Sequence, residues 1–235
     1  MSKILGSVQT LWRYPVKSML GESCNSLAIN RRGVVGDRLF AIRNRQGKFG
    51  SGKNTCRFRH IDGLLALQSF YQKNLPVIEF PNGQIMRGDE ANIHTVLSQT
   101  LGQPVTLAKE NRISHFDDSP IHIITTASLK WLKKALPNSQ IDENRFRANL
   151  ILDVVGDTLV EHQWVGKQIQ VGEVKLKITK LCERCVMTSS PQKNLPQDPQ
   201  IFQHIMRQSN SMFGVYARVV DSGVVSLNDE VKVCI

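Results

Sequence analysis

Short stretches in which apolar and polar residues alternate dominate this chain. Such stretches, each bounded by Gly, Pro or Asn, cover residues 4–12, 24–29, 38–43 and 76–80. A two-residue period places successive side chains on opposite faces of an extended backbone, so each stretch predicts a β-strand. Tight hairpin turns are expected at residues 81–83 before 84–87, at 172–173 between 168–171 and 174–179, and at 221–223 between 215–220 and 224–227.

Helical spacing is confined to a few segments. We expect helices over residues 62–71, 92–101, 127–136 and 199–207, with polar residues near their starts. The last has the clearest start, because Asp198 can cap it and Pro199 occupies its first position. Many strands with isolated helices favour an α+β, mainly β fold, as a barrel or sandwich rather than a doubly wound sheet. The polar stretch 111–120 is the predicted seam between two halves.

Length and composition indicate a folded chain with one large or two small domains. The chain has 235 residues, of which 41% are hydrophobic and 21% charged. No apolar run approaches the roughly 18 residues of a membrane span, and the N-terminus lacks the pattern of a signal peptide. Five cysteines, an odd number, disfavour a secreted disulfide scaffold. A cytoplasmic protein with reduced thiols and no membrane contact is expected.

The net charge of +10 is concentrated in one segment. Residues 31–59 contain nine Lys or Arg and a single acid, Asp37. Such a segment indicates an anionic partner, whether a phosphorylated cofactor, an acidic protein or nucleic acid, although a solvated basic face is an alternative. Nucleic acid is the least favoured partner, because the chain has only 9 Phe, 3 Trp and 3 Tyr and no base-stacking motif within the basic segment.

Residues 47–54 resemble a phosphate-binding loop without all of its features. Gly47, Gly52 and Lys53 have the spacing of that motif, but Asn54 replaces the hydroxyl residue that should bind magnesium. The residues that follow do not predict the helix whose N-terminus would hold the anion. We therefore expect a Gly-rich hairpin and no nucleotide hydrolysis.

Cys182 and Cys185 lie at the end of a predicted strand, with Arg184 between them. A thiolate is soft and nucleophilic, and a neighbouring guanidinium favours the charged form. Such a sulfur can bind a soft metal, carry sulfur or exchange disulfides. Two core cysteines on a strand are the simplest alternative.

Two other interpretations of this Cys pair are disfavoured. A structural zinc site needs two further ligands, and His162 and His204 lack the required pairing. A thioredoxin-like motif is followed by a helix, whereas residues 186–191 are expected to be extended.

Cations and hydroxyls occur at several other turns and strand ends, and each is a weak signal alone. They are Lys17, Ser18, Arg38, Ser128, Arg147 and Asn149. Ser128 lies where a buried strand runs into a helix start, a position suited to an anion. Arg147 and Asn149 are expected on the same face of a strand, where they would present paired donors. His122 and His162 are interpreted as core or surface residues.

Taken in order, these segments resemble a known family. Their patterns are Tyr-Pro-Val-Lys-Ser at 14–18, Gly-Asp-Arg at 36–38, Ser-Pro-Ile-His-Ile-Ile-Thr-Thr-Ala-Ser-Leu at 119–129, Arg-Phe-Arg-Ala-Asn at 145–149, Cys-Glu-Arg-Cys at 182–185 and Phe-Gly-Val-Tyr at 213–216. They resemble the MOSC proteins, and among these the mitochondrial amidoxime reducing component and its bacterial relatives. The resemblance implies a β-barrel MOSC fold, with an N-terminal β-barrel region over 1–115 and a MOSC domain over 116–235.

The resemblance also implies roles for individual residues. By position, Cys185 corresponds to the family's molybdenum ligand, and Arg184 and Tyr216 correspond to residues that line the catalytic site. The positions that match residues holding the molybdenum–molybdopterin cofactor are Lys17, Ser18, Arg38, Ser128, Arg147 and Asn149. Lys and Arg suit its phosphate, because charge-assisted contacts to phosphate are stronger than neutral ones.

The implied reaction is reduction of a small N-hydroxylated substrate to the amine by a molybdenum-cofactor-dependent reductase. Bacterial relatives often carry an appended ferredoxin domain, whereas this chain stops at Ile235, so a separate flavodoxin- or ferredoxin-like protein is expected to supply electrons. The alternative is a carrier of molybdenum cofactor or of sulfur, with a persulfide on Cys185. The family often has Asp-Pro-x-Thr-Gly soon after the metal ligand, but residues 189–198 lack it, and this loop is expected to border the substrate entrance.

Overall fold

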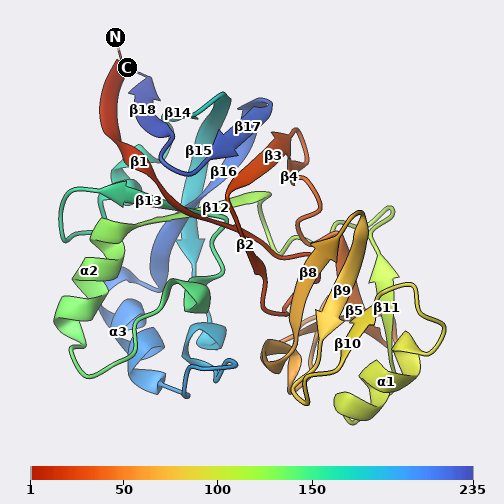
Figure 1. The fold of residues 1–235 in the computed structure, drawn as a ribbon. Helices are drawn as coiled ribbons and strands as arrows, with labels where there is room; N and C mark the ends of the chain where they lie inside the picture. The colour runs from red at the N-terminus through yellow and green to blue at the C-terminus, as the bar shows by residue number, and fades with distance from the viewer. Residues whose placement is uncertain (1, 235) are drawn as a thin grey trace.

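Strands outnumber helices in the computed structural model, which describes residues 2–234 (Figure 1). This part of the chain contains eighteen strands and three α-helices, which confirms the α+β, mainly β fold. None of its helices is both long and apolar enough to cross a membrane.

Seven strands close into a barrel. In ring order they are β13 (Leu150–Val154), β12 (Ile121–Thr125), β16 (Met212–Asp221), β15 (Val174–Glu183), β14 (Gln168–Val171), β18 (Glu230–Cys234) and β1 (Ser2–Arg13), and β1 pairs back with β13. A short strand, β2 (Glu22–Cys24), pairs with β1 beside the ring. Side chains along each strand alternate between the inside and the outside of the barrel. Those that point inward form one apolar core, which includes Val8, Leu150 and Val215.

Helix α2 (Thr126–Ala135) connects two parallel strands of this barrel, β12 and β13. Parallel neighbours require such a crossover, and the helix that makes it covers one face of the strands. All five residues of β12 are buried, including the polar His122 and Thr125. Helix α3 (Pro199–Ser209) packs on the same side, where Ile201 and Ile205 join the core beneath both helices.

Residues 40–109 lie beside the barrel and form what we call the second half of the molecule, which contains two small sheets and one helix (Figure 1). One sheet has the order β11 (Val105–Lys109), β5 (Phe40–Asn44), β6 (Phe49–Ser51), β7 (Phe58–His60), and the other has the order β10 (Ile85–Arg87), β9 (Leu75–Glu79), β8 (Gln68–Gln72). With helix α1 (Ile93–Thr100) they enclose a separate core that includes Ile42, Ile78 and Leu97.

The predicted helices at 92–101, 127–136 and 199–207 are confirmed as α1, α2 and α3. In α3, the Asp198 side chain accepts from the backbone N–H of Gln200, and Pro199 is the first helical residue, as expected. The prediction of a helix over 62–71 is wrong. A 3₁₀ turn at Leu64–Ala66 is followed by strand β8, because pairing with β9 overrides the weak local helical spacing.

The hairpins at 172–173 and after Pro81 are confirmed, but the third is wrong. Strand β17 (Gly223–Ser226) pairs with β3 (Ser26–Asn30), which in turn pairs with β4 (Gly33–Val34). The chain therefore leaves the barrel after β16 and crosses to strands from its N-terminal part. The barrel core contains Leu27 and Ile29 of β3 as well as Val225 of β17, so the division of the chain at residue 115 stays a prediction.

Candidate functional site

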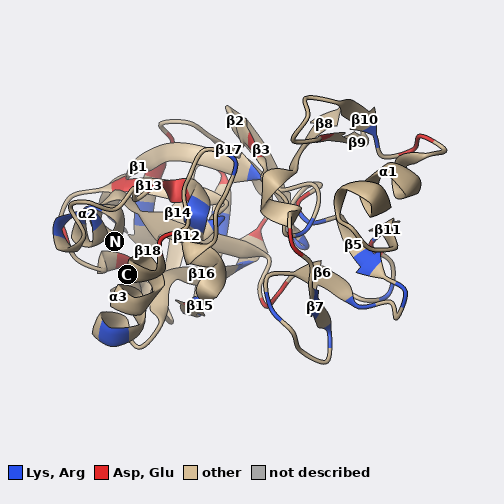
Figure 2. Cartoon of the chain, turned by 90° about the horizontal axis from the view of Figure 1, so that it is seen from below, with Lys and Arg blue, Asp and Glu red and all other residues tan. Residues whose placement is uncertain are grey.

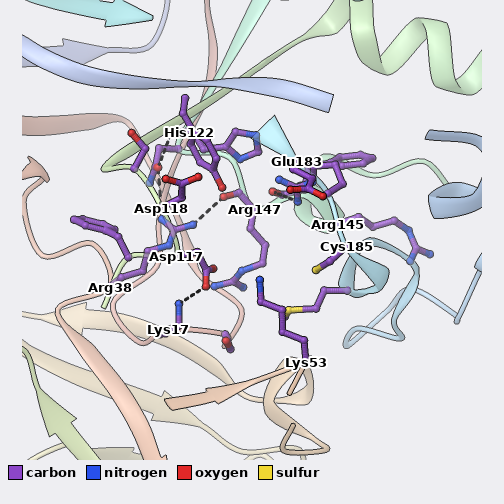
Figure 3. Close-up of a pocket in the computed structure, with 18 residues that line it drawn as sticks. Lys17, Arg38, Lys53, Asp117, Asp118, His122, Arg145, Arg147, Glu183 and Cys185 are labelled. Carbon is purple, nitrogen blue, oxygen red and sulfur yellow. Dashed lines mark hydrogen bonds and ion pairs between the residues drawn. The ribbon is translucent and has the colours of Figure 1, made fainter. Parts of the chain in front are cut away.

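A polar cavity of about 220 Å³ lies at the junction of the barrel and the second half of the molecule (Figure 3). Eight of the nine residues singled out from the sequence line it, namely Lys17, Ser18, Arg38, Arg147, Asn149, Arg184, Cys185 and Tyr216. They come from five separate stretches of the chain. The fold therefore gathers almost the whole predicted set at one place.

Ser128 is the exception, since it does not line this cavity. Its side chain is fully buried beneath α2, where the hydroxyl lies 2.6 and 2.5 Å from the two carboxyl oxygens of Glu161. Thr125, the N-cap of α2, contacts the same carboxylate through its own hydroxyl at 2.8 Å. The Ser128 hydroxyl was expected to contact a bound anionic cofactor. It contacts the Glu161 carboxyl group inside the protein instead, so its position does not support a cofactor contact.

Three of the cavity residues have left-handed backbone conformations. Among the described residues only seven non-glycine positions have positive φ, and they include Ser18 at 64°, Arg38 at 48° and Arg147 at 54°. Such conformations cost free energy in residues with a Cβ and are commonly retained where function requires them. The expected strand carrying Arg147 and Asn149 is wrong, because Arg147 ends a 3₁₀ turn (Glu143–Phe146) and Asn149 precedes β13.

Buried cations form one wall of the cavity. The Lys17 Nζ lies 2.8 Å from an Asp117 carboxyl oxygen, and only 3% of the Lys17 side chain is exposed. Arg38 forms an ion pair with the fully buried Asp37, and its Nη2 donates to the Arg147 carbonyl oxygen at 3.0 Å. The Arg38 and Arg147 guanidinium groups lie over the Tyr14 ring, with 4.7 and 4.4 Å to its centroid.

Burial makes this positive charge costly. It lowers the pKa of Lys17 to about 8, although Asp117 opposes the change. Burial and the neighbouring Arg38 lower the pKa of Arg147 to about 10. The buried Nη2 of Arg147 has no hydrogen-bond partner among residues 2–234. The wall therefore holds more positive charge and more N–H donors than the described residues satisfy, which favours an anion in the cavity.

Cys185 follows shortly after the end of β15 and is half-buried. The following residues, Val186–Ser189, form a 3₁₀ turn, so the expected extended stretch is wrong. Neighbouring Arg184 donates from Nη1 to the Cys182 Sγ at 3.0 Å and from Nη2 to the Phe146 carbonyl oxygen at 2.8 Å. Its buried Nε has no partner within the described chain. Cys182 itself is fully buried, which leaves Cys185 as the cysteine that faces the cavity.

The structure adds His122, Asp117 and Lys53 to the site. His122 is on the barrel strand β12, and its ring centroid lies 5.4 Å from that of Tyr216. Burial and the nearby Arg184 and Arg38 lower the pKa of His122 well below its usual value, so the ring is neutral. The alternation along β12 could have placed His122 on one face, but no sequence signal showed that this face opens into a cavity.

Arg145 fixes the loop that departs from the family pattern. Its side chain is buried, with Nε donating to the Gln140 carbonyl oxygen at 2.9 Å and Nη2 to that of Pro196 at 2.8 Å. Nη1 donates to the Ser190 carbonyl oxygen at 3.4 Å. One guanidinium thus holds both ends of residues 190–196 beside the cavity.

The basic segment 31–59 divides into an internal and a surface part. Arg32 pairs with Glu110 and Arg38 pairs with Asp37. Lys and Arg also gather along β5, β6, β7 and their connecting loops (Figure 2). Arg45, Lys48 and Arg59 line one hollow there. We call these three residues the basic surface. Lys53, from the same segment, reaches the Cys185 cavity.

Fold and site together define a MOSC protein. Residues 110–232 match the MOSC domain, and residues 5–110 match the MOSC N-terminal beta barrel domain. The chain therefore belongs to the MOSC family, as its sequence patterns predicted.

Its similarity to characterised members is distant. It is 26% identical over 228 residues to human mitochondrial amidoxime-reducing component 1, which covers 79% of this chain and 66% of that protein. It is 24% identical over 290 residues to the bovine mitochondrial amidoxime reducing component 2, covering 97% and 83%. The chain thus spans about two thirds of the length of the human relative. The YuaD protein of Bacillus subtilis has the same fold, with a TM-score of 0.56, 14% identity and coverage of 99% and 98%.

Proposed function

We propose that this chain binds molybdenum cofactor in the Cys185 cavity and reduces small N-hydroxylated substrates to amines. The observation that carries the proposal is the convergence of a cavity-facing thiol with buried cations whose N–H groups lack partners. The MOSC family includes reductases that depend on this cofactor, and the amidoxime reducing components are distant relatives.

The side chains present fit such a group. The Nη2 of Arg147, the Nε of Arg184 and the Nε2 of His122 are buried and unpartnered among the described residues. A buried donor without an acceptor costs about 1–3 kcal/mol, so each favours a ligand that brings acceptors. A pterin with its phosphate brings negative charge and many acceptors, which matches this donor set.

When bound, the cofactor would supply two-electron redox chemistry at molybdenum, for which a thiolate such as Cys185 is a suitable ligand. Lys17, Ser18 and Arg38 would hold the phosphate, and their strained or buried positions preorganise them for it. Arg147 and Asn149 would orient the pterin. Arg184 lies next to Cys185 in the chain, and its guanidinium donates to the Cys182 Sγ. The Tyr216 hydroxyl keeps its proton, because burial raises the pKa of Tyr216 far above its usual value.

Molybdenum content tests the binding step. The protein is produced in a host that makes molybdenum cofactor, and the metal is measured for the wild type and for Cys185→Ala. Cys56→Ala is the matched control, since Cys56 is an exposed free cysteine. We expect metal in the wild type and the control and little in Cys185→Ala. Equal, near-zero molybdenum in all three would contradict the proposal.

Turnover separates the reductase from a carrier. Benzamidoxime reduction is measured with an artificial electron donor in protein that contains molybdenum. Conversion to the amidine supports a reductase. Bound metal without conversion would favour a carrier of the cofactor or of sulfur.

A separate electron-transfer protein would dock on the basic surface. Three cations in one hollow suit an acidic flavodoxin- or ferredoxin-like partner. Turnover driven by such a partner should fall steeply as ionic strength rises, whereas turnover with a small uncharged donor should not. Reversing the charge at Arg45 and Arg59 should weaken only the partner-driven rate. Identical salt dependence for both donors would contradict docking at this surface.

A further inference from the structure

A second cavity adjoins the one that contains Cys185. It has a volume of about 290 Å³, and Met187 lines both cavities. Its walls come from residues 60–66 of the second half and from residues 190–193 of the loop that Arg145 fixes. Ile61, Leu64, Leu65 and Pro191 supply most of the apolar lining, and His60, Asp62 and Lys193 line the cavity as well. The space therefore suits an uncharged organic group more than a second phosphate.

Among the described residues, Met187 is the one common to the linings of the two cavities. Met187 packs against the bare backbone of Gly52, where an added Cβ would lie 2.4 Å from the Met187 Cγ. Its Sδ is 3.9 Å from the Ser51 hydroxyl. Methionine is unbranched and changes rotamer easily, so a ligand can extend from one cavity into the other by displacing this side chain.

The adjoining cavity contains an unsatisfied polar group. Gln192 lines it and is only 7% exposed, yet neither the Oε1 nor the Nε2 of its amide has a hydrogen-bond partner within residues 2–234. The backbone of Gln192 is fixed by reciprocal hydrogen bonds with Leu195, of 2.9 and 3.0 Å. Gln192 also borders a hollow on the side of Trp12, which shares no residue with the Cys185 cavity. Burial without partners is costly for an amide, so the arrangement points to a ligand that completes it.

We propose that this second cavity is a subsite that selects substrates carrying an amide-like group on an apolar ring, at the end remote from the N-hydroxyl group. A glutamine amide presents a donor and an acceptor side by side, so it can form two parallel hydrogen bonds with another amide edge. The apolar walls would bury the ring, and Gln192 would be a specificity-determining residue. The proposal rests on the proposed function for the position of the reacting group next to Cys185.

Two matched probes test the selectivity in protein that contains molybdenum. They are 4-carbamoylbenzamidoxime and its N,N-dimethylcarbamoyl form, which keeps the acceptor and loses the donor. For the wild type we expect kcat/KM to be about tenfold higher for the first, the effect of a buried hydrogen bond left unmade in the second. In Gln192→Leu the ratio should approach one. The control Gln99→Leu, on the exposed side of α1, should keep the wild-type ratio.

Gln192→Leu is expected to fold, because it replaces an unpaired buried amide by an apolar group of similar size. Its Tm should equal or exceed that of the wild type. Ala66→Phe gives a second variant, since it fills the cavity: it should slow both substituted probes and spare unsubstituted benzamidoxime. A wild-type probe ratio in folded Gln192→Leu, or equal loss for benzamidoxime in Ala66→Phe, would overturn the proposal.

Failure of the proposed function would look different. If the protein binds no molybdenum or reduces no probe, the subsite is tested with benzamide and N,N-dimethylbenzamide, followed by NMR at the Gln192 side-chain amide. Binding of benzamide alone, with a shift of that signal, supports the subsite regardless of catalysis. Absence of any shift, or equal shifts with both compounds, refutes it.

Discussion

The Lys17 ammonium and the Asp117 carboxylate meet across the cavity at 2.8 Å, although 100 positions separate them in the chain. Lys17 is buried, whereas 51% of the Asp117 side chain remains exposed. The pair, drawn with a dashed line in Figure 3, therefore joins a buried cation to a half-exposed carboxylate. An anionic ligand that reaches Lys17 would compete with Asp117.

This geometry predicts how stability depends on pH. Burial lowers the pKa of Lys17 to about 8 in the folded protein, from 10.5 for a free lysine. Between these values the unfolded chain binds more protons, so the contribution of Lys17 to the free energy of unfolding rises with pH. Over the whole interval between the two pKa values, Lys17 changes the free energy of unfolding by on the order of 3 kcal/mol. Lys17→Met removes the cost of burying this charge, so its free energy of unfolding should exceed that of the wild type at pH 7.5, and by less at pH 10. Urea unfolding at the two pH values measures both differences.

Other groups titrate in the same range, so the difference between wild type and variant is the quantity to compare. Lys130→Met, at an exposed position of α2, provides the control. A wild-type minus Lys17→Met difference that stays constant with pH would show that Lys17 is not desolvated.

Arg184 and Cys182 predict separable roles for the two cysteines. Cys182→Ala removes the acceptor of the Arg184 Nη1 and should lower the free energy of unfolding by about 1–3 kcal/mol. Cys182→Ser retains an acceptor and should cost less. Both variants should keep most of the bound molybdenum, in contrast to Cys185→Ala. Loss of metal from Cys182→Ser, measured by metal analysis of folded protein, would make Cys182 a ligand candidate too.

Arg145 should control the order of the loop over residues 189–198. Arg145→Met loses hydrogen bonds to three carbonyl oxygens and should destabilise the protein by about 2–4 kcal/mol. Hydrogen exchange should accelerate first at Leu195 and Asp198, whose N–H groups bond to this loop's own backbone. The exposed Arg207→Met on α3 should leave exchange unchanged. Unaltered exchange in Arg145→Met would mean that the loop is held by other contacts.

Ser128 and Ser18 should behave oppositely when their hydroxyls are removed. Ser128→Ala breaks the contact with Glu161 and should cost about 1–3 kcal/mol of stability with no loss of bound molybdenum. Ser18→Ala, within the cavity, should lower molybdenum retention on dialysis and change stability less. If Ser128→Ala keeps its stability but loses molybdenum, Ser128 contacts the cofactor, as its sequence position predicted.

Much of the site was accessible from sequence because its residues occur in short, ordered patterns. Cys185, Arg184 and the cations at 17, 38 and 147 were found in this way, and the fold brings them together. The left-handed backbone at Ser18, Arg38 and Arg147 was not predictable, because Ser and Arg rarely adopt positive φ, whereas glycine adopts it readily.

Two of the failures come from strand pairing that local spacing does not reveal. The segment 62–71 was expected to be a helix, but its end forms β8 in a hairpin with β9, and β17 leaves its sequence neighbour β16 for the distant β3. His122 and Gln192 acquire their importance from cavities built by several elements. Local periodicity carries no information on such partners.

The pairing of β1 with β18 also sets when the protein can fold. Lys3 lies opposite Val233, so the ring depends on a contact between two strands that lie far apart in the sequence. Until β18 has been made, β1 has no partner on that side, and the barrel stays open with an unpaired strand edge. Because this contact closes a very long loop, we expect the barrel to fold slowly for its size.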